Sequence, residues 1–422
     1  MNALHFSHPA MSALVQNKAS VWLREACHAA GKAQQVTETE ATGARQRFER
    51  FAPVLASLFQ EDGWDGRVRS PLLDYPSSPA DVGTFLIKAD HTLPMTGSIK
   101  ARGGVYELLC HLEMLARDAG LVEEHGPLDA LLTEEARALY AGRRVIVAST
   151  GNLGFSIGLV ARAFGMQAEI HMSHDAKSWK KNRLRRIGAA VVEHACDYEQ
   201  AVGRARSAAK GAGGYFIDDE RSRDLFVGYT TAAWELRNQL AARGIEIGPE
   251  RPLTVYLPCG VGGAPGGVTW GLRFLFGPHV IPVFVEPIAS ACVFVAMAAG
   301  GGAALSVYDA GLDNDTIADG LAVPKASQLV LDLIGHDIDA VVALPDEEML
   351  SWVRCAWKEA GLRLEPSAAS SFAAISYFLA NLGDGFLFGR DLTADHVRRG
   401  VHVAWTTGGA LLPDAEFERL LA

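Results

Sequence analysis

The chain alternates short apolar runs with amphipathic stretches of helical period over most of its length. Strand-like runs are expected at 84–88, 145–148, 167–172, 190–193, 214–217, 253–257, 280–285, 340–344 and 401–405. Helical patterns separate most of them, near 153–164, 176–187, 198–210, 226–240, 347–359 and 367–382. Strands that alternate with helices in this way form right-handed βαβ units and parallel sheets. The pattern therefore predicts an α/β fold.

The grouping of these elements predicts two domains, each with a mainly parallel sheet flanked by helices. The four strand-like runs between 145 and 217 suit a small four-stranded α/β domain over residues 141–222. We expect the large domain to comprise residues 81–140 and 223–422. Residues 1–80 form an N-terminal helical extension that packs on the large domain, because one helical stripe there is apolar: Phe48, Phe51, Leu55 and Leu58.

One lysine stands at a strand-to-helix turn. The segment 94–104 joins the strand at 84–88 to a helical pattern in which Leu108, Leu112 and Leu115 share a face. Lys100 therefore lies where a helix begins, and the partial positive charge of that helix end favours a neutral amine over an ammonium. Lysines of this kind form Schiff bases with carbonyl cofactors. A solvent-facing lysine at a helix start fits the local pattern too.

A glycine-rich loop follows the apolar strand at 253–257. Five glycines lie between residues 260 and 267, so successive backbone N–H groups can turn toward one anion in front of a helix. The loop lacks the lysine of a P-loop and the spacing of a dinucleotide-binding motif. We expect a phosphate cup, and a nucleotide-binding module is the alternative of another class. The residues of the cup are Gly260, Val261, Gly262, Gly263 and Ala264.

These two segments occur together with Ser149-Thr150-Gly151-Asn152 and Thr406-Thr407-Gly408-Gly409. In this order they resemble the fold-type II enzymes that use pyridoxal 5′-phosphate (PLP), and most closely the D-serine dehydratases, from about residue 84 to residue 413. The resemblance implies an α,β-elimination that converts D-serine to pyruvate and ammonia, with D-threonine as a further candidate substrate. An L-serine or L-threonine dehydratase and a serine racemase of the same fold are the alternatives.

The resemblance also implies which residues bind the cofactor. Lys100 would carry PLP and act in catalysis, the glycine loop would hold its phosphate, and Asn152 would contact the phenolic oxygen. Gly320 would lie beside the cofactor, and Thr407 would contact the pyridine nitrogen. A hydroxyl does not keep that nitrogen protonated as a carboxylate would, which weakens the ring as an electron sink and suits β-elimination.

Further roles concern the substrate and a cation. Ser149, Thr150, Gly151 and Asn152 would surround the substrate carboxylate, and Thr150 is our candidate for a second catalytic base. Glu286 matches an acid that helps bind a monovalent cation, K⁺ or Na⁺, in relatives. A capping acid or a surface acid is an equally good interpretation of Glu286.

The composition limits the kinds of partner and the cellular compartment that we expect for this chain. The formal net charge of −10 argues against nucleic acid or an anionic membrane as a partner. The 6 cysteines are scattered without metal-binding spacing, as is typical of a reducing compartment. The first residues begin no signal-peptide core, and prolines and glycines interrupt the apolar region at 280–305. We expect a cytoplasmic enzyme, monomeric or homodimeric, acting on a small molecule.

Overall fold

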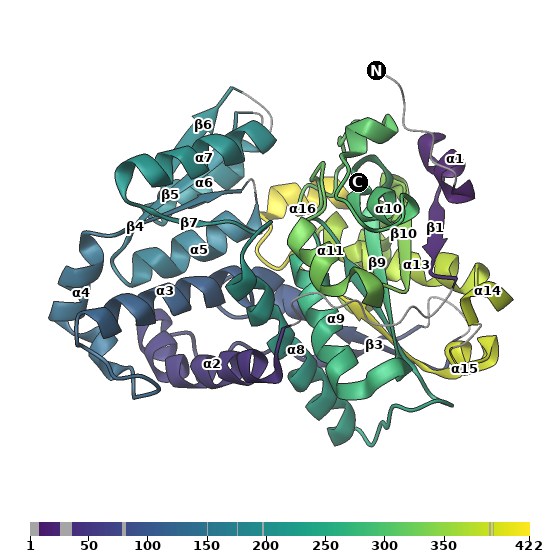
Figure 1. The fold of residues 1–422 in the computed structure, drawn as a ribbon, viewed down its shortest axis with the longest axis horizontal. Helices are drawn as coiled ribbons and strands as arrows, with labels where there is room; N and C mark the ends of the chain where they lie inside the picture. Colours follow the sequence, from purple (N-terminus) through teal and green to yellow (C-terminus); the bar gives the residue numbers. More distant parts are fainter. Residues whose placement is uncertain are drawn as a thin grey trace. The chain divides into compact units, whose positions relative to one another are not determined.

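The computed structural model describes residues 8–25, 36–77, 82–149, 151–174, 176–195, 198–387, 390 and 392–422. The chain forms two compact units, whose elements are labelled in Figure 1. Unit 1 contains Met1–Val36, Ser70–Thr92 and Tyr229–Ala422. Unit 2 contains Thr37–Arg69 and Leu93–Gly228. The chain therefore passes from one unit to the other four times.

Unit 1 is built on a seven-stranded sheet with the strand order β1-β10-β9-β8-β11-β3-β2. The five central strands run parallel, and β1 and β2 pair antiparallel at the two edges. Strands β8 to β11 are buried at every residue, as expected for parallel strands that helices cover on both faces. The strands are β1 (Ser20–Leu23), β2 (Leu72–Asp74), β3 (Thr84–Lys88), β8 (Leu253–Pro258), β9 (Val280–Pro287), β10 (Ala340–Leu344) and β11 (Val401–Trp405).

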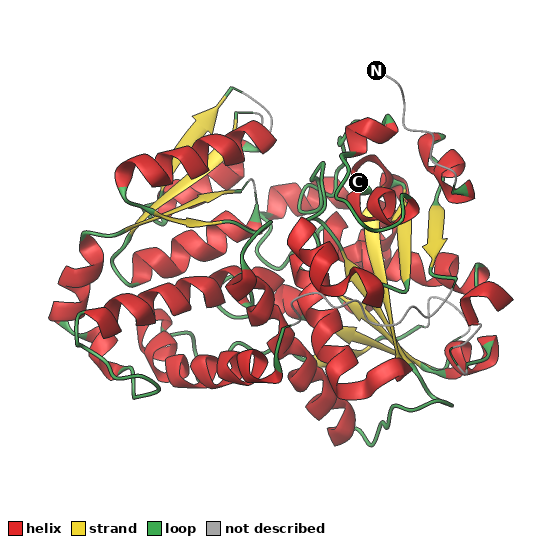
Figure 2. Ribbon diagram, in the orientation of Figure 1, coloured by secondary structure: helices red, strands yellow, loops and turns green. Residues whose placement is uncertain are grey.

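Helices surround this sheet, and Figure 2 shows them in red around the yellow strands. Helix α13 packs on β8, β9, β10 and β11, and its buried Phe378 joins Val283 and Val342 of the sheet in one apolar cluster. The helices of unit 1 are α1 (Pro9–Val15), α9 (Gly263–Phe276), α10 (Cys292–Ala298), α11 (Gln328–Ile334), α12 (Asp346–Ala360), α13 (Pro366–Ala380), α14 (Asp384–Leu387), α15 (Ala394–Arg399) and α16 (Asp414–Leu421), and the short 3₁₀ turn η1 spans Asp90–Thr92.

Unit 2 contains a four-stranded parallel sheet with the order β6-β5-β4-β7. Helices α5 and α7 both pack on β4 and β5, and Figure 1 shows α5 below the sheet and α7 drawn across its strands. Its strands are β4 (Arg144–Ala148), β5 (Gln167–Ser173), β6 (Ala190–His194) and β7 (Tyr215–Ile217). Its helices are α2 (Glu38–Phe59), η2 (Ile99–Ala101), α3 (Gly104–Asp118), η3 (Asp129–Leu132), α4 (Glu134–Ala141), α5 (Asn152–Ala163), α6 (Ser178–Arg186) and α7 (Tyr198–Ala212). Helix α8 (Arg223–Ala242) begins in unit 2 and continues in unit 1.

The predicted N-terminal helix is α2, which begins with a capping box between Thr37 and Glu40. Two residues of its predicted stripe, Phe51 and Leu55, are fully buried. Arg47 binds Glu113 of α3 at 2.6 Å, so α2 lies with unit 2. The N-terminal segment also contributes β1 and β2 to the sheet of unit 1.

The predicted fold class is confirmed: two mainly parallel sheets are flanked by helices, and each predicted strand has its counterpart. The compact units do not follow the domain boundaries expected from the sequence. Helix α3 packs on α5, β7 and α2, which places residues 93–140 in unit 2 rather than with the large sheet. The division into folding domains stays a prediction. Within the described parts of the chain, no helix has the length and hydropathy needed to cross a bilayer.

Candidate active site

Lys100 lies in the short helical turn η2, directly before α3. The preceding turn contains two residues with positive φ, Met95 at 64° and Gly97 at 58°. The carboxylate of Glu61, two residues after the end of α2, accepts the backbone N–H of Met95 at 2.8 Å and so restrains this turn. Lys100 itself is half-buried. The lysine thus occupies the strand-to-helix position predicted from the sequence.

Close packing brings the lysine turn beside the start of α5. A Cβ built on Gly104 would lie only 2.5 Å from Leu153 Cδ1, so the start of α3 packs tightly on α5 where residue 104 has no side chain. Helix α5 begins at Asn152, and η2 lies against it. The Lys100 turn and the Asn152 helix end are therefore neighbours within unit 2.

The residues before Asn152 form the predicted substrate loop. Ser149 is buried, and its Oγ accepts the backbone N–H of Gly151 at 3.2 Å. Gly151 is the N-cap residue of the 12-residue helix α5. The predicted second base, Thr150, lies outside the described residues.

A carboxyl group that the sequence did not single out lies near the lysine. Asp219 follows β7, and the charge of Lys100 is close enough to influence it. Desolvation raises the pKa of Asp219 to about 6, Lys100 acts in the opposite direction, and Asp218 raises it further. No motif marks Asp219, since only the folding of β7 beside α3 brings it to the lysine. A carboxyl group with this pKa can exchange protons near neutral pH.

The glycine loop lies in unit 1, between β8 and α9. Gly262 has φ of 103°, a conformation that favours glycine. The carbonyl groups of the loop are used within the protein: Val261 O accepts the N–H of Ser327 at 2.8 Å, and Gly262 O accepts that of Gly266 at 2.8 Å. Gly260 O accepts weak bonds from two buried thiols, Cys259 and Cys292.

The loop fits the phosphate group of PLP. The backbone hydrogen bonds of the described residues do not use the N–H groups of Gly262, Gly263 and Ala264, which open the 14-residue helix α9. Such N–H groups at a helix N-terminus, with carbonyls turned away, form an anion site. The donor set suits a phosphate dianion and provides no side-chain charge of its own.

Two adjacent threonines follow β11, and their hydroxyl groups have different surroundings. The Thr406 hydroxyl is fully buried and bonded to Lys88 O at 3.1 Å and to His91 Nδ1 at 2.7 Å. No hydrogen bond within the described residues uses the hydroxyl of Thr407, which is 9% exposed. Of the two threonines, Thr407 is therefore the one whose hydroxyl can serve a bound group.

Gly320 and the Thr407 segment both lie beside the start of α13, where Glu365 and Ser367 are found. A Cβ on Gly260 would lie 3.6 Å from Gly320 O, and a Cβ on Gly320 would lie 3.0 Å from Ser367 Oγ. The N–H of the neighbouring Glu365 binds Gly408 O at 3.2 Å. The structure thus brings the glycine loop, Gly320 and the Thr407 segment together within unit 1.

Glu286 is fully buried at the end of β9. Its two oxygens accept the N–H groups of Val293 and Phe294, each at 2.8 Å, so the carboxylate caps α10. Burial raises the pKa of Glu286 to about 8, and the two backbone hydrogen bonds act in the opposite direction. Cys292 Sγ lies 3.5 Å both from Glu286 and from Gly260 O, which links this acid to the glycine loop.

Comparison with curated proteins finds relatives that match this chain over most of its length. A protein of Rhizobium leguminosarum named "Probable D-serine dehydratase" is 41% identical over 434 residues, which cover 100% of this chain and 98% of that protein. A protein of Cupriavidus pinatubonensis with the same name is 46% identical over 386 residues, or 90% of this chain and 87% of that protein.

Solved structures show the same fold at low identity. Holo diaminopropionate ammonia lyase from Escherichia coli has a TM-score of 0.73 at 17% identity, with 96% of this chain and 97% of that chain covered. The processed form of threonine deaminase isoform 2 from Solanum lycopersicum has a TM-score of 0.63 at 20% identity, with 92% of this chain and 89% of that chain covered. Residues 64–386 match the family model described as pyridoxal-phosphate dependent enzyme. With its lysine turn and glycine loop, this chain belongs to the family of pyridoxal-phosphate dependent enzymes.

Proposed function

We propose that this chain is a D-serine dehydratase, a lyase that releases pyruvate and ammonia from D-serine. The observation that carries the proposal is the similarity over the entire chain to proteins named as probable D-serine dehydratases, at 41% identity. D-threonine, which has the same β-hydroxyl group, is a second candidate substrate. The match to the PLP family favours this reading over a nucleotide-binding module.

Three segments would hold the cofactor. The N–H groups of Gly260 to Ala264 would bind its phosphate, the amide of Asn152 would contact its phenolic oxygen, and the hydroxyl of Thr407 would contact its pyridine nitrogen, with Gly320 beside it. The unused N–H groups of the loop and the available hydroxyl of Thr407 support these roles. When bound, PLP supplies the conjugated ring that stabilises negative charge on the substrate Cα.

Lys100 and Asp219 are the groups that would move protons. Lys100 Nζ would take the Cα proton, and the bond from Cβ to the hydroxyl would then break. Hydroxide is a poor leaving group, so an acid is needed to protonate it. We assign that role to Asp219, because its pKa of about 6 and its proximity to Lys100 suit it. The enamine that results hydrolyses with one water to pyruvate and ammonia.

The substrate carboxylate would bind at the start of α5, between Ser149 and Asn152. With the carboxylate anchored there, only one enantiomer of serine presents its Cα proton to Lys100. The other enantiomer would present that proton to the opposite side and would need a second base. Thr150 is our candidate for that base. If it acts on D-serine, Thr150→Val should lower turnover by roughly 10²–10⁴-fold. Turnover that is retained in this variant would leave Lys100 as the base.

A monovalent cation, K⁺ or Na⁺, would bind near Glu286. A buried carboxylate close to the carbonyl of Gly260 provides oxygen donors of the kind that such ions use. We further propose that the enzyme works in the cytoplasm as a monomer or homodimer. Four cysteines of the described residues are free thiols, Cys110, Cys259, Cys292 and Cys355, which supports a reducing compartment.

A substrate panel tests the proposed function. The purified enzyme is given D-serine, L-serine, D-threonine and L-threonine, and release of pyruvate or ketobutyrate is followed. We expect D-serine to be the best substrate, and Lys100→Ala to abolish its turnover. Preference for L-serine or L-threonine would favour an L-specific dehydratase, and conversion of one serine enantiomer to the other would favour a racemase.

A further inference from the structure

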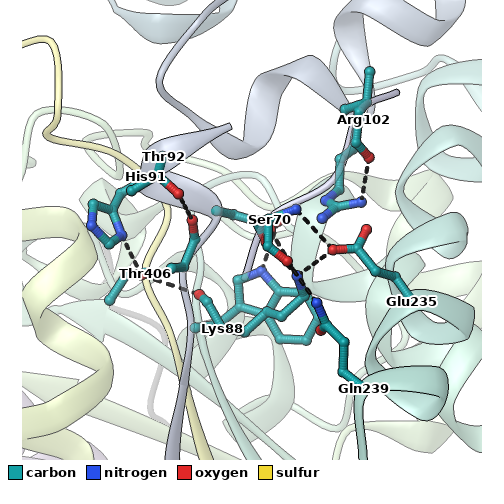
Figure 3. Close-up of polar contacts among 12 residues, drawn as sticks. Ser70, Lys88, His91, Thr92, Arg102, Glu235, Gln239 and Thr406 are labelled. Atoms are coloured by element: carbon teal, nitrogen blue, oxygen red, sulfur yellow. Dashed lines mark hydrogen bonds and ion pairs between the residues drawn. The ribbon is translucent and has the colours of Figure 1, made fainter. Parts of the chain in front are cut away.

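The hydroxyl of Thr406 is held between two groups of unit 1. It donates its single hydrogen to the carbonyl of Lys88, at 3.1 Å. Its oxygen must then accept a hydrogen from His91 Nδ1, at 2.7 Å. This geometry assigns the hydrogen of the neutral imidazole to Nδ1. Figure 3 shows the His91 ring turned toward Thr406, with Lys88 below them.

The protonation state of His91 agrees with this assignment. His91 is only 3% exposed, and desolvation lowers its pKa to about 4, against a smaller opposing effect of Asp90. The imidazole is therefore neutral throughout the neutral range, and its Nδ1–H is a constant donor. The contact to Thr406 does not switch with pH under working conditions.

Trp405, the residue before Thr406, is held by Asp90, a second buried side chain of the turn η1 that also carries His91. Trp405 Nε1 donates to Asp90 Oδ2 at 2.9 Å, and Ser70 Oγ donates to Asp90 Oδ1 at 2.5 Å. Lys88 Nζ in turn binds Ser70 O at 2.8 Å and Glu235 Oε1 at 2.6 Å. Asp90 and Lys88 are fully buried. The end of β11 is thus attached to η1 through two side chains, and Thr407 follows directly.

We propose that His91 is a positioning residue for Thr407. By holding the Thr406 hydroxyl, it fixes the backbone from which the Thr407 hydroxyl extends toward the pyridine nitrogen of PLP. The inference rests on the proposed cofactor role of Thr407. A functional hydroxyl must be held to within about 0.5 Å, and neighbouring hydrogen bonds provide that restraint. His91 itself touches neither substrate nor cofactor in this account.

The test is the dissociation constant of PLP, measured by titrating the apoenzyme, with three variants of two buried histidines. His91→Leu removes the donor, and His91→Asn keeps an N–H near the position of Nδ1. His402→Leu is the matched control, because His402 lies on β11, the strand that leads to Thr406. His402 is also buried and neutral, and it binds Tyr256 and Val397 instead of Thr406.

We expect His91→Leu to weaken PLP binding roughly 10-fold, the equivalent of one lost hydrogen bond. His91→Asn should stay within about threefold of the wild type, and so should His402→Leu. Unchanged binding in His91→Leu would overturn the proposal. An equal loss in His402→Leu would overturn it too, because general loosening of the sheet would then explain both.

A double-mutant cycle with Thr407→Val separates this inference from the proposed function. If His91 acts through the Thr407 hydroxyl, His91→Leu should have less than about a twofold effect on PLP binding in the Thr407→Val background. An undiminished effect there would contradict the inference. If Thr407→Val alone left PLP binding unchanged, the cofactor role of Thr407 would fail instead, whatever His91 did.

Discussion

Gly104 and Leu153 lie in close contact where α3 packs on α5, next to the two turns of unit 2 that carry the candidate chemistry. A Cβ on Gly104 would lie 2.5 Å from Leu153 Cδ1, and Ile157 Cδ1 would follow at 3.2 Å. Lys100 lies one turn before Gly104, and Asn152 directly precedes Leu153. The absence of a side chain at residue 104 therefore allows α3 to pack closely on α5, next to the turns that carry Lys100 and Asn152.

Gly104→Val should push α3 away from α5. We expect a loss of about 1–3 kcal/mol in the free energy of unfolding of the apoenzyme, as for an overpacked core, and weaker binding of PLP. Denaturant unfolding and PLP titration measure the two effects. Gly142→Val is the control, because no atom lies within 4 Å of a Cβ at that residue. The added mutation Leu153→Ala should restore part of the loss; failure to do so would argue against this contact.

The glycine loop can be tested by comparing the two ends of α9. Gly262 at its start and Gly277 at its end both have positive φ, 103° and 59°. Gly262→Ala and Gly277→Ala should each cost about 1–3 kcal/mol of backbone strain. A Cβ on Gly262 would point at Val330 Cγ1, 3.1 Å away. The added methyl group would therefore affect phosphate binding by changing the backbone conformation of the loop. Only Gly262→Ala should weaken PLP binding, and equal affinities in both variants would place the phosphate elsewhere.

The sequence predicted the lysine turn and the glycine loop, but it did not predict the residues that other parts of the chain bring next to the site residues. Lys100 and Gly260 to Ala264 stand at junctions between a strand and a helix, and such junctions are visible in local patterns of apolar residues and glycines. Asp219 could not be predicted in this way, because only the folding of β7 beside α3 brings it near enough to feel the charge of Lys100. The contact between His91 and Thr406 is hidden for the same reason, since 315 residues separate its partners.

The fold shows the same difference between local and distant information. The four strands β8 to β11 are buried at every residue and largely apolar, so their positions followed from the pattern. The edge strand β1 is short, and it pairs with β10 through the register Ser20 to Ala343. Helix α2 carries an apolar stripe that was recognised, but the sequence did not reveal its partner, which is α3 through Arg47 and Glu113.

If Asp219 is the acid that protonates the leaving group, the effect of its mutation on kcat should depend on which group leaves the substrate. Asp219→Asn should lower kcat for D-serine by roughly 10²–10⁴-fold, because hydroxide must be protonated as it leaves. β-Chloro-D-alanine, whose chloride leaves without a proton, should be turned over at close to the wild-type rate. Steady-state assays of pyruvate release compare the two substrates, with Glu220→Gln as a neighbouring control. Equal losses for both substrates would assign Asp219 a role other than acid catalysis.

Glu107 makes the stability of unit 2 depend on pH. Burial raises the pKa of Glu107 from 4.5 to about 8, and the Tyr215 hydroxyl donates to its Oε1 at 3.2 Å. Between these values the unfolded chain loses the proton while the folded chain keeps it, so stability falls as pH rises. Glu107→Gln should remove a loss on the order of 2–4 kcal/mol between about pH 5 and pH 8.

Denaturant unfolding at several pH values measures this effect. Exposed Glu124, changed to Gln, serves as the control and should leave the pH dependence as it is in the wild type. A Glu107→Gln variant whose stability declined with pH as steeply as the wild type would show that another group titrates in this range.

The most direct test of the account is to locate the lysine that holds PLP. The holoenzyme is reduced with borohydride and digested, and the labelled peptide is identified by mass spectrometry. We predict that the label lies on Lys100, and that Lys100→Ala loses both the label and the yellow colour of the holoenzyme. A label on any other lysine, or a protein that takes up no PLP, would contradict the account.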